Sequence, residues 1–188
     1  HRFKRNVIGL LESIIDGQPG KGPVLATAYI HETLRDISRY SLLNEGSMWR
    51  PLILRAVASD YEVKRELVTH YSSIIEAIHG LTLNLDDLPC MDDATERRGK
   101  PTAYINFAEK LSASKDSGTA KVILNVFGYL SHFDAYVIHG PASLEQNIKI
   151  FDELTLAKIN LASWQEIDLS DTQKITDLKG FADFYRLK

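Results

Sequence analysis

The chain has 188 residues, of which 44% are hydrophobic and 25% are charged, and its formal net charge is −3. These values are ordinary for a globular protein and argue against extensive disorder. The net charge lacks the basic excess that a nucleic-acid surface needs. No apolar run approaches the roughly 18 residues of a membrane span. The only cysteine, Cys90, allows no internal disulfide. We therefore expect one domain over residues 1–188, no nucleic-acid partner, no membrane span and a cytoplasmic location.

Hydrophobic residues recur at helical spacing along nearly the whole chain. In the first helix Val7, Leu11 and Ile14 repeat at three and four, and Gly17 ends the pattern. Later helices are expected at about 23–40, from Pro51 onward, and at about 63–87, 103–113, 118–138, 142–169 and 177–188. No stretch alternates strictly between apolar and polar residues as a half-buried strand does. The predicted fold class is all-α.

The run LDDLPCMDDATERRGKPT, from Leu85 to Thr102, places an acidic block directly before a basic block. The two blocks consist of Asp86, Asp87 and Asp92, followed by Arg97, Arg98 and Lys100. Carboxylate oxygens are ligands that Mg²⁺ accepts, and guanidinium groups bind phosphate oxygens in pairs. The run predicts a site for a magnesium-complexed di- or triphosphate. The alternative is a solvated charged loop, which is what most such runs are.

Helical spacing groups some of these residues in space. His79, Thr82 and Asp86 stand at i, i+3 and i+7, so we expect them to share one face and to line one cavity. Asp92 would point elsewhere if the helix continued, but Pro89 breaks the helix and allows the chain to fold back. Asp86 and Asp92 can then bracket a metal ion.

The run resembles the first aspartate-rich motif of the trans-isoprenyl diphosphate synthases, the polyprenyl synthetase family that makes geranyl, farnesyl and geranylgeranyl diphosphates. The match is close to word-for-word from Asp86 to Met91 and again from Arg97 to Thr102. The resemblance implies an isoprenoid-synthase helical bundle around a central cavity. It also implies a homodimer and Mg²⁺ ions that hold an allylic diphosphate.

The resemblance assigns catalytic roles to four residues of the run. Asp86 and Asp92 would be the metal ligands, and Asp87 would support them from behind. Arg97 would steady the allylic diphosphate.

The resemblance also suggests residues that bind the two substrates. Arg50, His79 and Arg98 would contact the second substrate, isopentenyl diphosphate. Gln165 falls in an element similar to the family's GQxxD, and Lys188 aligns with a lysine that contacts the allylic diphosphate. Leu81 and Thr82, about one helical turn before the aspartates, would lie where the growing tail passes and would set the product length.

One loop departs from the family pattern. Residues 44–51 stand where the family has GGKRxRP; Arg50 and Pro51 match, but Ser47 and Met48 replace the lysine and the next arginine. Charged hydrogen bonds are worth about 1.5–3 kcal/mol each, so affinity for isopentenyl diphosphate should suffer. The chain shown also stops before the family's second aspartate-rich motif. The fold is therefore expected to be incomplete at the C-terminus, either as a fragment of a longer enzyme or as a reduced relative.

The leading hypothesis is a magnesium-dependent prenyltransferase that condenses an allylic diphosphate with isopentenyl diphosphate, with a farnesyl, geranylgeranyl or longer product. The alternative is a catalytically reduced, synthase-like subunit that binds and modulates an active prenyl diphosphate synthase as a heteromer. The intact aspartate and arginine blocks favour the enzyme, whereas Ser47 and Met48 favour the subunit.

Overall fold

The computed structural model describes residues 2–17, 29–43 and 46–169. Two compact units make up the chain, His1–Leu144 and Glu145–Lys188. The first unit contains a short hairpin, β1 (Glu96–Arg97) and β2 (Lys100–Pro101), and the helices α1 (Arg2–Asp16), α3 (Glu32–Leu42), α4 (Trp49–Asp60), α5 (Arg65–Asp86), α6 (Ala103–Lys110) and α7 (Lys115–Ile138). The described part of the second unit lies in α8 (Leu144–Leu169). The predicted all-α fold is confirmed.

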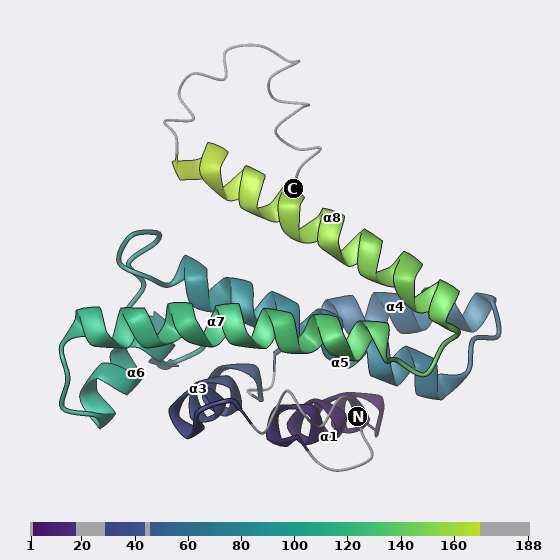
Figure 1. The fold of residues 1–188 in the computed structure, drawn as a ribbon, viewed down its shortest axis with the longest axis horizontal. Helices are drawn as coiled ribbons and strands as arrows, with labels where there is room; N and C mark the ends of the chain where they lie inside the picture. Colours follow the sequence, from purple (N-terminus) through teal and green to yellow (C-terminus); the bar gives the residue numbers. More distant parts are fainter. Residues whose placement is uncertain (1, 18–28, 44–45, 170–188) are drawn as a thin grey trace. The chain divides into compact units, whose positions relative to one another are not determined.

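Helix α5 is the centre of the first unit, because α1, α3, α4 and α7 all pack against it (Figure 1). Its apolar face is fully buried, as shown by Ile74, Ala77 and Leu81, which have no exposed surface. The predicted core of α1 is also confirmed, since Val7, Leu11 and Ile14 are buried completely. Within the described residues, no helix combines the length and the apolar composition that crossing a lipid bilayer requires.

Helix α7 packs on α3, α5 and α6. It lies close to α6 at Gly118, where any side chain would collide with the backbone oxygen of Tyr104. The helix begins three residues earlier than predicted, at Lys115, because the hydroxyl of Ser114 accepts a hydrogen bond of 3.2 Å from the N–H of Ser117. This N-cap satisfies one of the free donors of the first turn.

The prediction of one helix over 23–40 is confirmed from Glu32 onward and is wrong at residues 29–31. Tyr29 and Ile30 form a turn and a bend, and α3 begins only at Glu32. The reason is a cap, since Nδ1 of His31 accepts a hydrogen bond of 3.2 Å from the N–H of Thr33. Residues 23–28 and the predicted helix at 177–188 lie outside the described residues.

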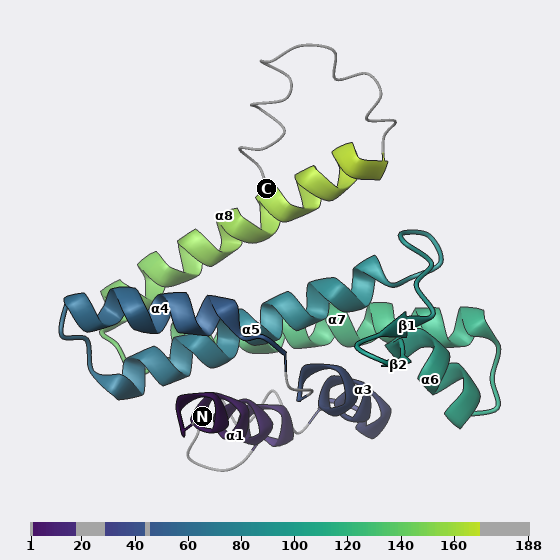
Figure 2. The same ribbon diagram turned by 180° about the vertical axis from the view of Figure 1, so that it is seen from behind.

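The hairpin is the second difference from the prediction. Figure 2 shows the loop that leaves α5 and returns through β1 and β2 to α6. Each strand has two residues, paired as Glu96 with Pro101 and Arg97 with Lys100. Strands this short cannot produce the alternating pattern by which a strand is recognised in a sequence.

Candidate functional site

The chain turns back over the end of α5. The backbone N–H of Asp92 donates a hydrogen bond of 2.9 Å to the carbonyl oxygen of Asp86, and the N–H groups of Met91 and Asp93 donate to the carbonyl of Leu88 at 2.9 and 3.0 Å. The fold-back predicted from the helix break is confirmed. Asp86 is half-buried and Asp92 is exposed, so both predicted metal ligands lie at the surface of the unit.

The third carboxylate of the run, Asp87, is already bound. Nε of Arg97 lies 2.8 and 3.0 Å from its two carboxylate oxygens, and Nη2 lies 2.6 Å from one of them. Asp87 is only 2% exposed, and its hydrogen bonds raise the pKa of Arg97. No described residue is bonded to the remaining nitrogen of Arg97, Nη1. The pair fixes the hairpin to the end of α5.

The hairpin turn presents Arg98 to a second loop. Arg98 and Gly99 have φ values of 55° and 72°, and positive φ at both central residues is what a type I′ turn requires. A Cβ at Gly46 would lie 2.8 Å from Nη2 of Arg98. The glycine therefore makes the space that the guanidinium occupies, and the two loops meet there.

A crevice of about 50 Å³ lies between α3, α5 and the hairpin. Its lining includes Glu76, His79, Leu83, Asp87, Arg97 and Arg98. The volume suits a side-chain-sized group and is too small for a prenyl tail.

The prediction that His79, Thr82 and Asp86 line one cavity is wrong for this crevice. His79 lines it, but Thr82 and Asp86 do not. At about 100° per residue, Leu83 and Asp87 return to within about 20° of Glu76 around the helix. His79 lies at one side of this stripe, and Thr82 and Asp86 lie farther round in the same direction.

Positive charge dominates around the crevice. Burial, followed by the charges of Arg50, Arg98 and Arg97, lowers the pKa of His79 to about 4. The imidazole is therefore neutral at neutral pH. Burial raises the pKa of Glu76, while Arg50, Arg98 and Lys4 oppose that shift. Such a field favours an anion.

Lys4 is a residue that the sequence reasoning missed. Its ammonium group, on α1, donates a hydrogen bond of 2.8 Å to the carbonyl oxygen of Ser47, 43 residues away. A cation thus reaches the loop in which Ser47 replaces the family's lysine. No local pattern could have indicated it, because the two residues are adjacent only in the folded chain.

Met48 lies in a different environment from Ser47. It is 4% exposed and belongs to an apolar cluster with Phe3, Val7, Ala58 and Val68. The position aligned with an arginine is therefore part of the core in this chain.

The remaining predicted residues are placed as follows. Leu81 has no exposed surface, and Thr82 is half-buried with its hydroxyl donating 2.8 Å to the carbonyl of His79. Gln165 is half-buried on α8, in the second unit. Lys188 lies outside the described residues.

The carboxylates fit a particular kind of metal site. Among the described residues there is no group of three or more His, Cys, Asp or Glu side chains that could hold a metal ion. Mg²⁺, however, is commonly bound by one or two carboxylates and completes its shell with water and substrate phosphates. Two carboxylates such as those of Asp86 and Asp92 would be enough for such an ion, and the described residues form no closed cage.

Comparison with known proteins bears on this site. A geranylgeranyl pyrophosphate synthase of Arabidopsis thaliana (number 10, mitochondrial) is 33% identical over 137 residues, which cover 73% of this chain and 38% of that protein. A farnesyl diphosphate synthase of Haemophilus influenzae is 38% identical over 76 residues, which cover 40% of this chain and 26% of that protein. The chain thus spans well under half the length of these curated relatives.

Solved structures show the same fold. An FPP/GFPP synthase from Zymomonas mobilis has a TM-score of 0.77 at 22% identity, and an isoprenoid synthase family member from Thermotoga neapolitana has 0.76 at 20%. Each match covers all of this chain and 64% of the other. The family model described as polyprenyl synthetase matches residues 31–188, which is most of the sequence. With the aspartate-rich loop and the helical architecture in agreement, the chain belongs to the polyprenyl synthetase family.

Proposed function

We propose that the chain is the N-terminal part of a magnesium-dependent prenyltransferase that condenses an allylic diphosphate with isopentenyl diphosphate. The observation that carries the proposal is the 2.9 Å hydrogen bond from the N–H of Asp92 to the carbonyl of Asp86. It brings two carboxylate-bearing residues together directly beside the arginine hairpin. Residues 1–188 would supply one synthase-like domain, and the reaction belongs to isoprenoid biosynthesis.

On the allylic side, Asp86 and Asp92 would hold Mg²⁺ together with the diphosphate. Bound Mg²⁺ supplies Lewis-acid stabilisation of the charge that develops on the leaving diphosphate. Arg97, held by Asp87, would direct its remaining N–H groups at Nη1 toward the same oxygens. The allylic C–O bond breaks, the double bond of isopentenyl diphosphate forms the new C–C bond, and loss of a proton completes the step.

On the isopentenyl side, Arg50, Arg98 and Lys4 would bind the second diphosphate. Their charges act together on Glu76. His79 is neutral in this field, so it can accept or donate a hydrogen bond without adding charge. Lys4 would replace the cation that is lost at Ser47.

The length of the product would depend on the face of α5 beyond the crevice. Thr82 is half-buried and Leu81 is fully buried, so we place the tail against Thr82 with Leu81 behind it. Neither side chain is aromatic, which is compatible with farnesyl, geranylgeranyl or longer products.

The partner would be a second copy of the chain. Helix α7 exposes Ile123, Leu124 and Phe127, with 47%, 58% and 76% of their surfaces accessible. Large apolar side chains gathered on one helix mark an interaction surface. We propose that a homodimer covers them.

One observation favours the second candidate, a reduced subunit that modulates an active synthase. Met48 lies in the core cluster, so the isopentenyl site has one cation fewer than the family loop provides. A subunit of this kind would still bind the allylic diphosphate and would assemble with a synthase as a heteromer.

Thermal melts test the metal-dependent allylic site. Ligands that bind the folded state stabilise it, so Mg²⁺ and geranyl diphosphate together should raise Tm by more than the sum of their separate effects. Asp86→Ala should abolish this synergy, and Asp60→Ala, an exposed change at the far end of α4, should retain it. Equal synergy in the parent chain and Asp86→Ala would refute the site.

A further inference from the structure

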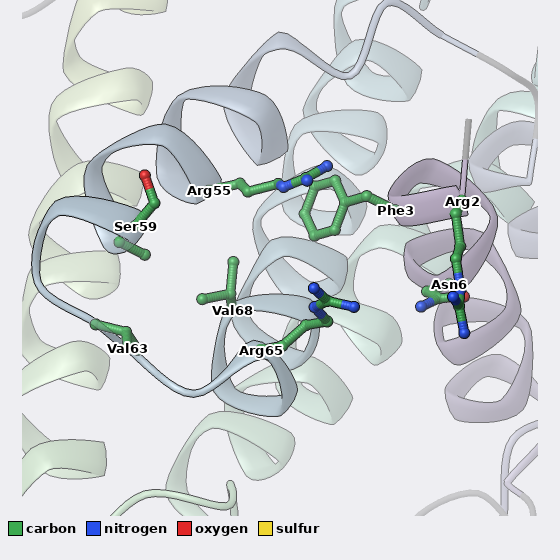
Figure 3. A pocket seen from close by; sticks show the side chains of 9 residues that line it. Arg2, Phe3, Asn6, Arg55, Ser59, Val63, Arg65 and Val68 are labelled. Atoms are coloured by element: carbon green, nitrogen blue, oxygen red, sulfur yellow. The ribbon is translucent and has the colours of Figure 1, made fainter.

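A second cavity lies at the end of α5 opposite the aspartates. It has a volume of about 530 Å³ and is bounded by α1, the C-terminal half of α4 and the start of α5 (Figure 3). A helix rises about 1.5 Å per residue, so Val68, in this cavity, is about 28 Å along α5 from Asp87. None of the residues assigned above to the diphosphate site lines it.

Three arginines from three different helices line this cavity. They are Arg2 of α1, Arg55 of α4 and Arg65 of α5, and no acidic residue accompanies them in the lining that the described residues form. In the part of the chain that the structure describes, none of the three guanidinium groups forms an ion pair or a hydrogen bond. Like charges around one space repel one another, and an anion between them removes that repulsion.

The amide of Asn6 adds a neutral polar group to this arrangement, whereas the hydroxyl of Ser59 already donates a hydrogen bond of 2.6 Å to the carbonyl oxygen of Ala56. Figure 3 shows the side chains of Asn6 and Arg2 together on α1, across the cavity from Ser59 on α4. The N-cap of α5, Lys64, makes no capping bond with its side chain. The free N–H groups of the first turn add the positive end of a 22-residue helix to the same edge of the cavity.

The remaining lining is apolar. Phe3, Ala58 and Val68 are 8%, 7% and 7% exposed and form the floor. The guanidinium of Arg55 lies 5.0 Å from the centre of the Phe3 ring. The cavity thus combines several phosphate-binding groups with an apolar surface, and its volume lies within the range of about 300–1,000 Å³ typical of small-molecule sites.

We propose that this cavity binds a small amphiphilic organic phosphate. Its phosphate oxygens lie among Arg2, Arg55 and Arg65, and its apolar part lies on Phe3 and Val68. Guanidinium groups suit phosphate because they donate two parallel hydrogen bonds in a fixed plane. The site is independent of the proposed prenyltransferase activity, since it shares no residue with the aspartate loop or the hairpin.

Calorimetric titration of the 188-residue chain in EDTA tests the proposal, because the chelator silences the magnesium-dependent site. The probes are inorganic pyrophosphate and geranyl diphosphate. The variant is Arg55→Gln/Arg65→Gln, and the matched control is Arg5→Gln/Lys64→Gln. The control removes the same charge from two other exposed positions, on α1 and at the N-cap of α5, that do not line the cavity.

We expect saturable binding of both probes, with geranyl diphosphate bound more tightly. The cavity variant should raise its Kd at least tenfold, and the control should change it less than threefold. Circular dichroism melts of both variants establish that they are folded. If the cavity variant and the control lose the same affinity, binding depends on net charge and not on the cavity. If the two probes have equal Kd values, the apolar surface of the cavity contributes nothing to binding. Either result overturns the proposal.

A membrane lipid carries the same chemistry, so a third arm uses vesicles that contain phosphatidic acid. Sedimentation of the parent chain with these vesicles, without calorimetric binding of geranyl diphosphate, would overturn the assignment of a small-molecule ligand. Binding of geranyl diphosphate that depends on Arg55 and Arg65 would support it.

Discussion

The guanidinium of Arg97 is bound to both carboxylate oxygens of Asp87, at 2.6 to 3.0 Å. The guanidinium is thereby held in one orientation, with both N–H groups of Nη1 and the second N–H of Nη2 left to donate to a ligand. The pair also joins the hairpin to α5, so it serves the architecture as well as the proposed chemistry.

Removal of the cation from this pair should destabilise the fold. Arg97→Gln leaves the buried carboxylate of Asp87 without its partner, and we expect a loss of about 2 kcal/mol because Arg97 itself is partly exposed. Urea unfolding measures the loss. The double variant Asp87→Asn/Arg97→Gln should recover part of it, since no charge is then left unpaired. An unchanged midpoint in Arg97→Gln would show that water satisfies Asp87 equally well.

Lys4 should matter for isopentenyl diphosphate and not for the allylic ligand. Its ammonium group lies beside the loop at Ser47, so Lys4→Gln should weaken isopentenyl diphosphate binding about tenfold, the equivalent of one charged hydrogen bond. Ser47→Lys should strengthen it, because position 47 is exposed and can carry a charge. Calorimetry with both ligands measures the effects, and Arg5→Gln is the control. If Lys4→Gln and Arg5→Gln behave alike, Lys4 is not part of the site.

His79 should make stability depend on pH. Its pKa is about 4 in the folded chain, against an ordinary value of 6.5. Between these pH values His79 binds a proton in the unfolded chain but not in the folded chain, so stability falls as the pH drops from 6.5 to about 4. The urea midpoint should therefore decrease less between pH 7 and pH 5 in His79→Gln than in the parent chain. Equal decreases would mean that His79 titrates normally.

The two residues assigned to product length should behave differently. Leu81→Phe adds volume to a site with no exposed surface, so it should cost about 1–3 kcal/mol through overpacking. Thr82→Phe should instead weaken geranylgeranyl diphosphate more than geranyl diphosphate, because more of the longer tail would have to pass the added ring. Melts and competitive binding separate the effects. Equal weakening of both diphosphates by Thr82→Phe would place the tail elsewhere.

Local patterns in the sequence predicted the helices and the aspartate loop well. The spacing of Val7, Leu11 and Ile14 identifies a buried face, and Pro89 marks the place where the chain turns back to Asp92. These features depend on residues close together in the sequence, and the physics that produces them is equally local.

Features that depend on distant residues could not be predicted in the same way. Lys4 reaches Ser47 only after α1 has packed on α5, and the second cavity requires α1, α4 and α5 together. His31 is a further case, because a histidine is not among the preferred N-cap residues. The choice between Asp86 and Asp87 as the residue facing the crevice depended on the position of the hairpin, which no periodicity indicated.

The turn at Arg98 has a consequence for how this loop can evolve. A left-handed backbone costs an ordinary L-residue of the order of 1–2 kcal/mol, and Gly or Asn would occupy the position with less strain. A chain selected for thermal resistance alone would drift toward those residues at position 98. The arginine at this position therefore combines backbone strain with a positive charge placed against Gly46. If directed evolution selects for stability in variants that no longer need the site, we expect position 98 to be substituted first.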